Sequence, residues 1–273
     1  MQKIILLNIF LSGLTNIFCQ YHAIYIPDEK LSEIRMDGDT TDWSWVPEQY
    51  VITTAYMSDL LSNKNIDEKS WNCKIIVGWN DVKNWIYIMA VVHDDIINTD
   101  GIPEGLFFLD DCMEIAVNPD NLGGKYDNKE DKRCFNTIKI YSVSDSAFAF
   151  KVDKGPSWIC QKKSGSMDWG YQIHENNKEK TTVVVYEIGM HLWDRWNDEG
   201  VKLSKSHRLI SNQTIRLTIG INDVDHKTNQ REALWGTSIG SWPSNADDIS
   251  LFVLDPPPAT CTSWETIHRL LKP

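Results

Sequence analysis

Residues 73–93 read Cys-Lys-Ile-Ile-Val-Gly-Trp-Asn-Asp-Val-Lys-Asn-Trp-Ile-Tyr-Ile-Met-Ala-Val-Val-His, and they decide the fold class. Two apolar runs rich in β-branched and aromatic residues, 73–79 and 85–93, flank the short polar segment 80–84. Such residues favour strands, and a connection this short joins antiparallel neighbours. The sequence therefore predicts a β-hairpin whose second strand is buried.

Further strands follow on both sides of this hairpin. The predicted strands are 51–57, 113–117, 137–143, 147–152, 181–190, 214–222 and 249–254. Turn residues separate them, and helical periodicity is scarce. We therefore predict an all-β protein, an antiparallel β-sandwich of the jelly-roll or immunoglobulin-like type.

Long polar connections interrupt this pattern at 118–133 and 153–177. Residues 153–168 are predicted as a loop, with a short strand at 158–161 as an alternative, and 191–199 as a helical turn. Long loops often carry or reshape a binding site.

The two ends of the chain differ from this body. Residues 1–3 are followed by an apolar run, 4–18, and then by Cys19 and Gln20, which is typical of a secretory signal peptide. We predict a signal peptide over 1–19, one sandwich domain over 20–254, and a proline-rich spacer with a short C-terminal helix over 255–273. No stretch has the roughly 20 apolar residues that a membrane span needs, so no transmembrane span is predicted.

The signal-like segment predicts a secreted or periplasmic protein. A second interpretation is a lipid anchor at Cys19 on the cell surface, although Phe18 is bulky where a lipid-acceptor motif has a small residue. Six cysteines occur, and five remain without Cys19: Cys73, Cys112, Cys134, Cys160 and Cys261. No pair has C-x-x-C spacing, so a zinc knuckle or redox motif is not supported, while disulfides and buried free thiols both stay open.

Composition narrows the classes of partner. The 273 residues are 42% hydrophobic and 24% charged, which is typical of a globular protein with a core. The formal net charge is −11 and no basic stripe offsets it, which argues against nucleic acid. The 12 tryptophans are unusually many, and such rings serve either as core mass or as ligand-facing surface.

Motifs of the common catalytic classes are missing from the sequence. There is no G-x-S-x-G, no phosphate-binding glycine loop and no H-E-x-x-H. Glu114 and Glu187 each lie within a predicted strand, but nothing pairs them as glycoside hydrolysis requires. A non-catalytic protein is therefore predicted.

Acidic residues cluster at several turns, and calcium is the ion that such oxygen ligands would suit. The segment from Asp223 does not match a calcium-binding EF-hand loop, because its fifth position is Lys227 and its twelfth is Leu234. A calcium site assembled from separate loops and a set of solvated turn carboxylates both stay open.

The stretch 106–118, Leu-Phe-Phe-Leu-Asp-Asp-Cys-Met-Glu-Ile-Ala-Val-Asn, joins an aromatic pair to an acidic cluster. Ring faces pack on sugar C–H groups and carboxylates accept hydrogen bonds from hydroxyls, so this composition suits a polyol ligand. The alternative is a strand that enters the core behind a solvated loop.

Six short motifs, in order, resemble carbohydrate-binding module family 9 and its relatives. Residues 34–43 are similar to the opening x-I-D-G-x-x-D-x-x-W of that family. The other matches are V-G-W-N-D at 77–81 with W-I-Y-I at 85–88, V-H-D-D at 92–95, D-C-M-E-I at 111–115, V-V-Y-E-I at 184–188 and I-G-I-N-D-V-D at 219–225. Together these matches run from residue 34 to residue 225, within the predicted sandwich domain 20–254.

The resemblance implies a secreted β-sandwich that grips a saccharide end between two aromatic rings. It places one ring at Phe108, where the family has Trp, and the other at Trp242. A basic residue of the family corresponds to Lys139, and Asp111 and Asn222 match motif positions. It implies no required cofactor, with calcium as an optional structural ion.

The leading hypothesis is a secreted, non-catalytic carbohydrate-binding protein that acts in polysaccharide binding or breakdown, with a glycoside hydrolase as one candidate partner. One alternative is a haem-binding electron-transfer subunit of the related sandwich type, with Met113 and His93 as axial ligands. Another is a scaffold module for a partner enzyme.

Overall fold

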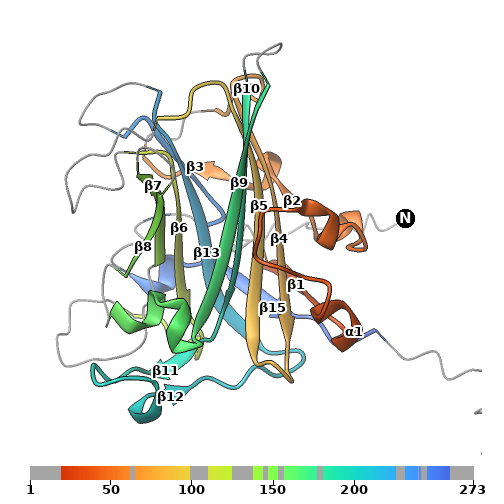
Figure 1. Cartoon of the computed structure of the whole chain (residues 1–273), viewed down its shortest axis with the longest axis vertical. Coiled ribbons are helices and arrows are strands. Elements are labelled where there is room, and N and C mark those ends of the chain that lie inside the picture. Colours follow the sequence, from red (N-terminus) through yellow and green to blue (C-terminus); the bar gives the residue numbers. More distant parts are fainter. Residues whose placement is uncertain are drawn as a thin grey trace, which may run out of the picture.

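The computed structural model describes residues 20–61, 65–98, 110–124, 138–143, 147–152, 157–176, 181–225, 231–238, 240 and 245–258 (Figure 1). For 138–143, 147–152, 157, 160 and 176 the description covers the backbone only. The predicted signal peptide and the predicted C-terminal helix lie outside the described residues. No helix in the described part of the chain is long and apolar enough to cross a membrane.

Two packed β-sheets make up the body of the molecule (Figure 1). The first contains β4 (Trp71–Asn80), β5 (Trp85–Asp94), β10 (Thr181–Met190) and β9 (Met167–Asn176), with the short β2 (Ile52–Thr53) beside β4. The second runs β8 (Ala147–Val152), β7 (Ile138–Val143), β6 (Cys112–Asn118), β13 (Thr214–Asp223) and β15 (Leu251–Leu254), with β14 (Ala233–Gly236) and β3 (Ser58–Asp59) alongside. The predicted all-β sandwich is confirmed.

The first strand, β1 (Gln20–Tyr25), joins the two sheets. Its first residues pair with β15 and its last two with β4, and both pairings are parallel. β1 therefore adds two parallel pairings to a sandwich whose other described strand pairs are antiparallel. Parallel pairing is possible here because long connections, rather than hairpins, link β1 to β4 and to β15 along the chain.

The hairpin that decided the fold class is confirmed. β4 and β5 pair along their full length, from Trp71 opposite Asp94 to Asn80 opposite Trp85. The Asn80 side chain accepts a hydrogen bond of 2.7 Å from the Lys83 backbone N–H, and Asn84 adopts a positive φ of 57°, which closes the tight turn.

The core lies between the sheets and is built from every second residue of the strands. Its largest buried side chains include Trp71, Trp79, Phe252 and Met113. Burying a side chain of this size contributes roughly 1.5–3 kcal/mol to stability. Cys73 is a small residue of this core, and Cys112 is buried on the same side of β6 as Glu114.

A second apolar cluster covers the outer face of the β4–β5–β10 sheet. Residues from the segment 34–51 pack there, including Trp43, over Tyr87 and Met89. The short helix α1 (Asp28–Leu31) precedes this segment, which contains the 3-10 turns η1 (Thr40–Trp43) and η2 (Glu48–Tyr50). Covering both faces explains why β5 is apolar at nearly every position.

Glu187 on β10 anchors this covering segment. Its carboxylate accepts hydrogen bonds from the backbone N–H groups of Asp37 (3.0 Å) and Gly38 (2.6 Å) and from Trp43 Nε1 (2.6 Å). Gly38 has a φ of 84°, and a Cβ there would lie 2.4 Å from the Gln172 backbone nitrogen, so only glycine fits. The Asp-Gly…Trp pattern thus supplies three N–H donors to one buried carboxylate, that of Glu187.

Two sequence predictions differ from the structure around β9. Residues 153–168 contain the 3-10 turns η5 (Ser157–Cys160) and η6 (Lys162–Ser164), and β9 then runs for 10 residues paired with β10. The predicted helical turn at 191–199 contains strand β11 (Trp193–Arg195), which pairs with β12 (Lys205–Ser206). β9 escaped detection because this edge strand has polar residues on its outer side and a half-covered inner side.

Candidate functional site

The outer face of the β6–β13 pair carries an unusual set of polar side chains. Met113, Ile115 and Ile221 point into the core, so their alternating neighbours Glu114 and Asn222 point outward. Strand pairing aligns Ile221 with Met113, which brings the two outward residues together. This face around Glu114 is called the outer-face site below.

Glu114 is the centre of the outer-face site. Its Oε1 accepts hydrogen bonds from Arg231 Nη2 at 2.7 Å and from Asn222 Nδ2 at 3.3 Å. The Glu114 residue is only 1% exposed, and the Arg231 side chain is 15% exposed. A carboxylate held by a guanidinium makes strong charge-assisted hydrogen bonds of fixed direction. The buried Glu114 carboxylate therefore orients the partly exposed Arg231 guanidinium, a donor that suits a ligand rich in hydroxyl groups.

Asn222 links Glu114 to Cys112 through its side-chain amide. Besides Glu114, its Nδ2 donates to Cys112 Sγ at 2.6 Å, and the residue is buried. Buried polar groups that are already hydrogen-bonded hold their neighbours in place rather than move to meet a ligand. Two hydrogen bonds thus hold Asn222 beside Glu114 on the same face, and direct ligand contact by Asn222 stays a prediction.

Lys139 shares this face by strand register. β7 pairs with β6 so that Lys139 lies directly opposite Glu114. Directly opposite residues of an antiparallel pair project to the same face. The backbone register therefore places Lys139 beside Glu114, and a ligand contact by Lys139 stays a prediction.

Phe108 and Trp242, the two predicted rings, lie outside the described residues. The described segment after residue 244 packs on the outer face, because Ala246 and Ile249 cluster with Ala116 of β6 and with Leu234. Ala116 is two residues from Glu114 on the same side of β6. The described chain thus reaches the neighbourhood of the site, and the stacking role of both rings stays a prediction.

Asp111 lies just before β6, and its hydrogen bonds connect β6 to the segments that contain Asn98 and Val224. Its carboxylate accepts hydrogen bonds from the backbone N–H groups of Asn98 (2.5 Å) and Val224 (2.8 Å). The residue is buried, and burial followed by repulsion from Asp94 raises its pKa well above the ordinary value. These bonds give Asp111 a structural role, and a contact with ligand stays a prediction.

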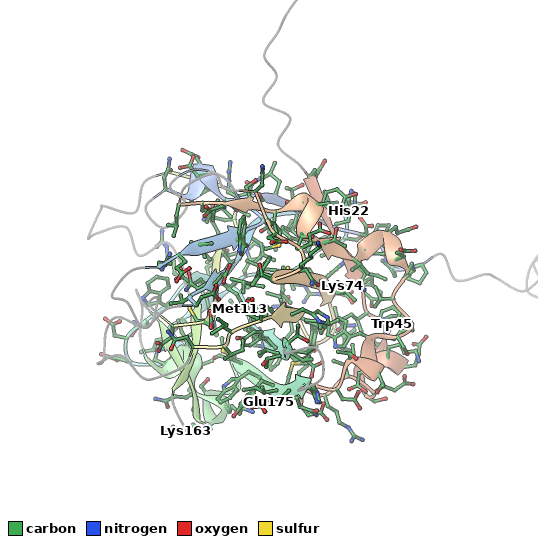
Figure 2. The ribbon with its side chains drawn as sticks, turned by 90° about the horizontal axis from the view of Figure 1, so that it is seen from above. His22, Trp45, Lys74, Met113, Lys163 and Glu175 are labelled. Carbon is green, nitrogen blue, oxygen red and sulfur yellow. The ribbon has the colours of Figure 1, made fainter. Side chains whose placement is uncertain are left out.

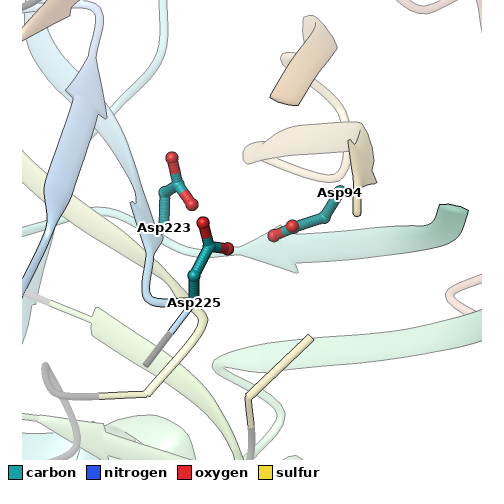
Figure 3. A group of neighbouring side chains, drawn as sticks. All are labelled: Asp94, Asp223 and Asp225. Atoms are coloured by element: carbon teal, nitrogen blue, oxygen red, sulfur yellow. The ribbon is translucent and has the colours of Figure 1, made fainter. Parts of the chain in front are cut away.

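A second carboxylate group, called the acidic cluster below, lies at the end of the sandwich where β5 and β13 finish. One oxygen from each of Asp94, Asp223 and Asp225 lies within 4.8 Å of the others, and the carboxylates point toward a shared space (Figure 3). Asp94 and Asp223 follow the inward-facing Val92 and Ile221 at strand periodicity, so the cluster bridges the two sheets.

The acidic cluster has the chemistry of a cation site. Asp94 is 1% exposed; one oxygen accepts from the Ile96 backbone N–H at 3.0 Å, and the buried Oδ2 has no hydrogen-bond partner. Burial, together with repulsion from Asp223 and Asp225, raises the pKa of Asp94 to about 8. Burial likewise raises the pKa of Asp223 to about 6, opposed by a 3.1 Å hydrogen bond from Trp235 Nε1. Three converging carboxylates match the oxygen ligands that Ca²⁺ prefers.

The two residues considered as haem ligands do not converge. Met113 is fully buried between the sheets and lies in the interior of the view from above (Figure 2). His93 is on the other sheet, at the outward position that alternates with the core residue Val92. One iron could not bind both side chains in this arrangement.

Sequence reasoning missed Arg231 and underrated Glu114. Arg231 belongs to a short segment before β14 without strand periodicity, and Glu114 is 117 residues away in the sequence. The only local signal was an acidic residue inside an otherwise apolar strand, which requires a buried partner.

Comparison with known proteins rests on structure alone. No protein-family model and no curated protein matches the sequence. A carbohydrate-binding module of family 9 from Caldicellulosiruptor kristjanssonii, solved with cellotriose, is similar with a TM-score of 0.51 and 13% identity, covering 89% of this chain and 97% of that chain. A module of this family from the same organism, solved with glucose, gives a TM-score of 0.49 and 12% identity over 89% of this chain and 100% of that chain. The chain has the fold of a family 9 carbohydrate-binding module.

Proposed function

We propose that this protein binds carbohydrate, without catalysis, at the outer-face site. The observation that carries the proposal is the buried Glu114 carboxylate, held by Arg231 and Asn222 directly opposite Lys139. A solved module of similar fold holds cellotriose, which supports a glycan as the ligand class.

Each part of the site has a distinct task in this proposal. Glu114 holds the Arg231 guanidinium in place, while Arg231 and Lys139 donate to ring and hydroxyl oxygens. Phe108 and Trp242 pack their ring faces on the sugar C–H groups. Because Arg231 and Asn222 engage Glu114 in the free protein, the guanidinium is oriented before the ligand arrives, which lowers the entropy cost of binding.

Glycan titration tests this proposal. Cellotriose and a panel of other oligosaccharides are titrated into the protein and followed by calorimetry and tryptophan fluorescence. Glu114→Gln keeps the shape and removes the charge, and we expect affinity to fall about tenfold or more. Glu33→Gln is the matched control, because Glu33 forms an exposed ion pair with Lys30 at 2.6 Å away from the site. A panel without any binding, or equal affinities of the two variants, would overturn the proposal.

The acidic cluster supports a structural calcium ion in the same protein. Asp94, Asp223 and Asp225 would hold it, and the unpartnered Asp94 Oδ2 is the group that most needs a cation. A bound Ca²⁺ would supply the positive charge that offsets repulsion among these carboxylates. Calorimetry of the chelator-treated protein with Ca²⁺ tests this: Asp225→Asn is expected to weaken binding, and no heat of binding for the unaltered protein would contradict it.

The proposed setting is outside the cytoplasm, in polysaccharide binding or breakdown, with a glycoside hydrolase as candidate partner. The signal-like composition of 1–19 supports secretion. Mass spectrometry of the protein from the medium of expressing cells tests it. A chain that stays inside the cell with these residues attached would refute secretion.

A further inference from the structure

A small pocket lies at the edge of the sandwich where β1 begins, apart from the outer-face site. Its volume is about 220 Å³, and its walls come from the start of β1, from η2 and from η3 (Thr54–Tyr56). The side chains that matter here are Gln20, Tyr21, His22, Gln49, Tyr50 and Tyr56. In the order of strands, β15 and β13 separate β1 from β6, so this edge pocket is distinct from the site around Glu114.

Hydrogen bonds hold the walls of the edge pocket in place. Asp255 binds two of them: one oxygen lies 2.7 Å from His22 Nδ1, and the other accepts from Tyr50 Oη at 2.7 Å. Tyr21 Oη donates to the Tyr56 backbone carbonyl at 2.7 Å, which fixes the backbone of the opposite wall. Side chains that are fixed before binding lose little conformational entropy when a ligand arrives.

The chemistry of the lining selects a class of ligand. Tyr56 is 57% exposed although it is a large aromatic residue, and Tyr50 contributes a half-buried ring. Ring faces of this kind pack on the C–H groups of a sugar. Exposed polar side chains, including His22 and Gln49, surround the rings and can exchange hydrogen bonds with hydroxyls.

The volume of the edge pocket and the charges around it narrow the class of ligand further. Sites for drug-sized ligands occupy roughly 300–1,000 Å³, so about 220 Å³ suits one small ring. Glu48 lines the pocket and Asp255 lies behind its wall, which disfavours an anionic ligand such as a sugar phosphate. A neutral monosaccharide unit fits these conditions.

We infer that the edge pocket is a second carbohydrate site, which takes a single neutral sugar ring between Tyr50 and Tyr56. The choice of a sugar rests in part on the proposed function, whereas the pocket and its aromatic lining are independent of it. Two sites on separate faces would let one molecule hold two points of a polysaccharide, which raises its apparent affinity for the polymer.

The test separates the two sites. Glucose, galactose, mannose and xylose are the probes, and saturation-transfer NMR detects their contact with protein carrying Glu114→Gln. We expect residual binding in that variant, and Tyr56→Ala added to it should weaken this binding about tenfold. Val82→Ala is the control, because Val82 is 74% exposed on the hairpin turn far along the chain from the pocket. Both substituted positions are on the surface, so the fold should persist, as a thermal melt would confirm.

The outcomes discriminate between the two proposals. Residual binding that Tyr56→Ala removes and Val82→Ala leaves intact supports the edge pocket. If Glu114→Gln alone abolishes every contact, or if Tyr56→Ala has no more effect than Val82→Ala, the edge pocket is overturned while the outer-face site stands. If Tyr56→Ala removes binding and Glu114→Gln does not weaken it, the outer-face site fails instead.

Discussion

The outer-face site and the acidic cluster start from neighbouring residues of one strand, yet their carboxylates have opposite surroundings. Asn222 points outward to Glu114, and Asp223, the next residue, belongs to the acidic cluster. Glu114 faces the guanidinium of Arg231, whereas Asp94 faces two further carboxylates. The neighbour of a carboxylate therefore decides its chemistry: Glu114 orients a guanidinium donor, and Asp94 suits a cation.

The Arg231→Ala variant removes the partner of Glu114 in the outer-face site, and among the substitutions it should have the largest effect on stability. Glu114 would stay buried without its guanidinium partner, and we expect the free energy of unfolding to fall by about 3 kcal/mol. Urea denaturation measures this change. Glu114→Gln in the same chain should recover most of the loss, because the charge is then gone, and Arg208→Ala is an exposed control. A loss of stability that Glu114→Gln fails to recover would show that the ion pair is not its cause.

The pH dependence of stability probes the acidic cluster. In the metal-free protein the pKa of Asp94 is raised from 3.8 to about 8, so the folded state favours the protonated acid. This contribution is full below pH 4 and is lost as the pH rises through 8, so stability should fall between pH 5 and pH 8 with a limiting slope of roughly 1.4 kcal/mol per pH unit.

Thermal melts across this range, with and without Ca²⁺, measure the effect. Saturating Ca²⁺ should flatten or reverse the trend, because the ion binds the deprotonated carboxylates. Asp94→Asn should flatten it without the ion. A metal-free protein that grows more stable from pH 5 to pH 8 would contradict this account of the cluster.

The Trp235→Phe variant tests whether the acidic cluster and the outer-face site act independently, and its effect on stability should be the smallest. It keeps an aromatic ring against Trp71, at 5.6 Å between centroids in the parent, and removes the hydrogen bond to Asp223. We expect a loss of about 1 kcal/mol in the metal-free protein, since that bond stabilises the ionised carboxylate. Calorimetry should find glycan affinity unchanged. A matching drop in glycan affinity would mean that the two regions act as one site.

Much of the fold could be predicted from local sequence. The hairpin from Trp71 to Asp94 was recognisable because both of its faces are covered, so its apolar run is nearly unbroken. β9 was missed because an edge strand needs only one apolar face, and half of that face is open to solvent. The parallel pairing of β1 was missed because local periodicity carries no information about which distant strand a segment joins.

The candidate site was predictable only in part. The sequence pointed to Lys139 and Asn222 through a family resemblance, and the strand register brings both to the face of Glu114. Arg231 was out of reach, because nothing in its local sequence distinguishes it from any solvated arginine. Asp94, Asp223 and Asp225 were visible as acidic turns, but their convergence was not.

The sequence by itself determined most of the long strands and which of their residues point inward, since both follow from alternation along the chain. It also placed carboxylates at positions where burial would be costly. Only the tertiary structure decided which partner each one meets: Arg231 for Glu114, two aspartates for Asp94, and three N–H donors for Glu187. The physical reason is that strand order and register bring together residues more than a hundred positions apart, and a buried charge takes its properties from what lies within a few ångströms of it.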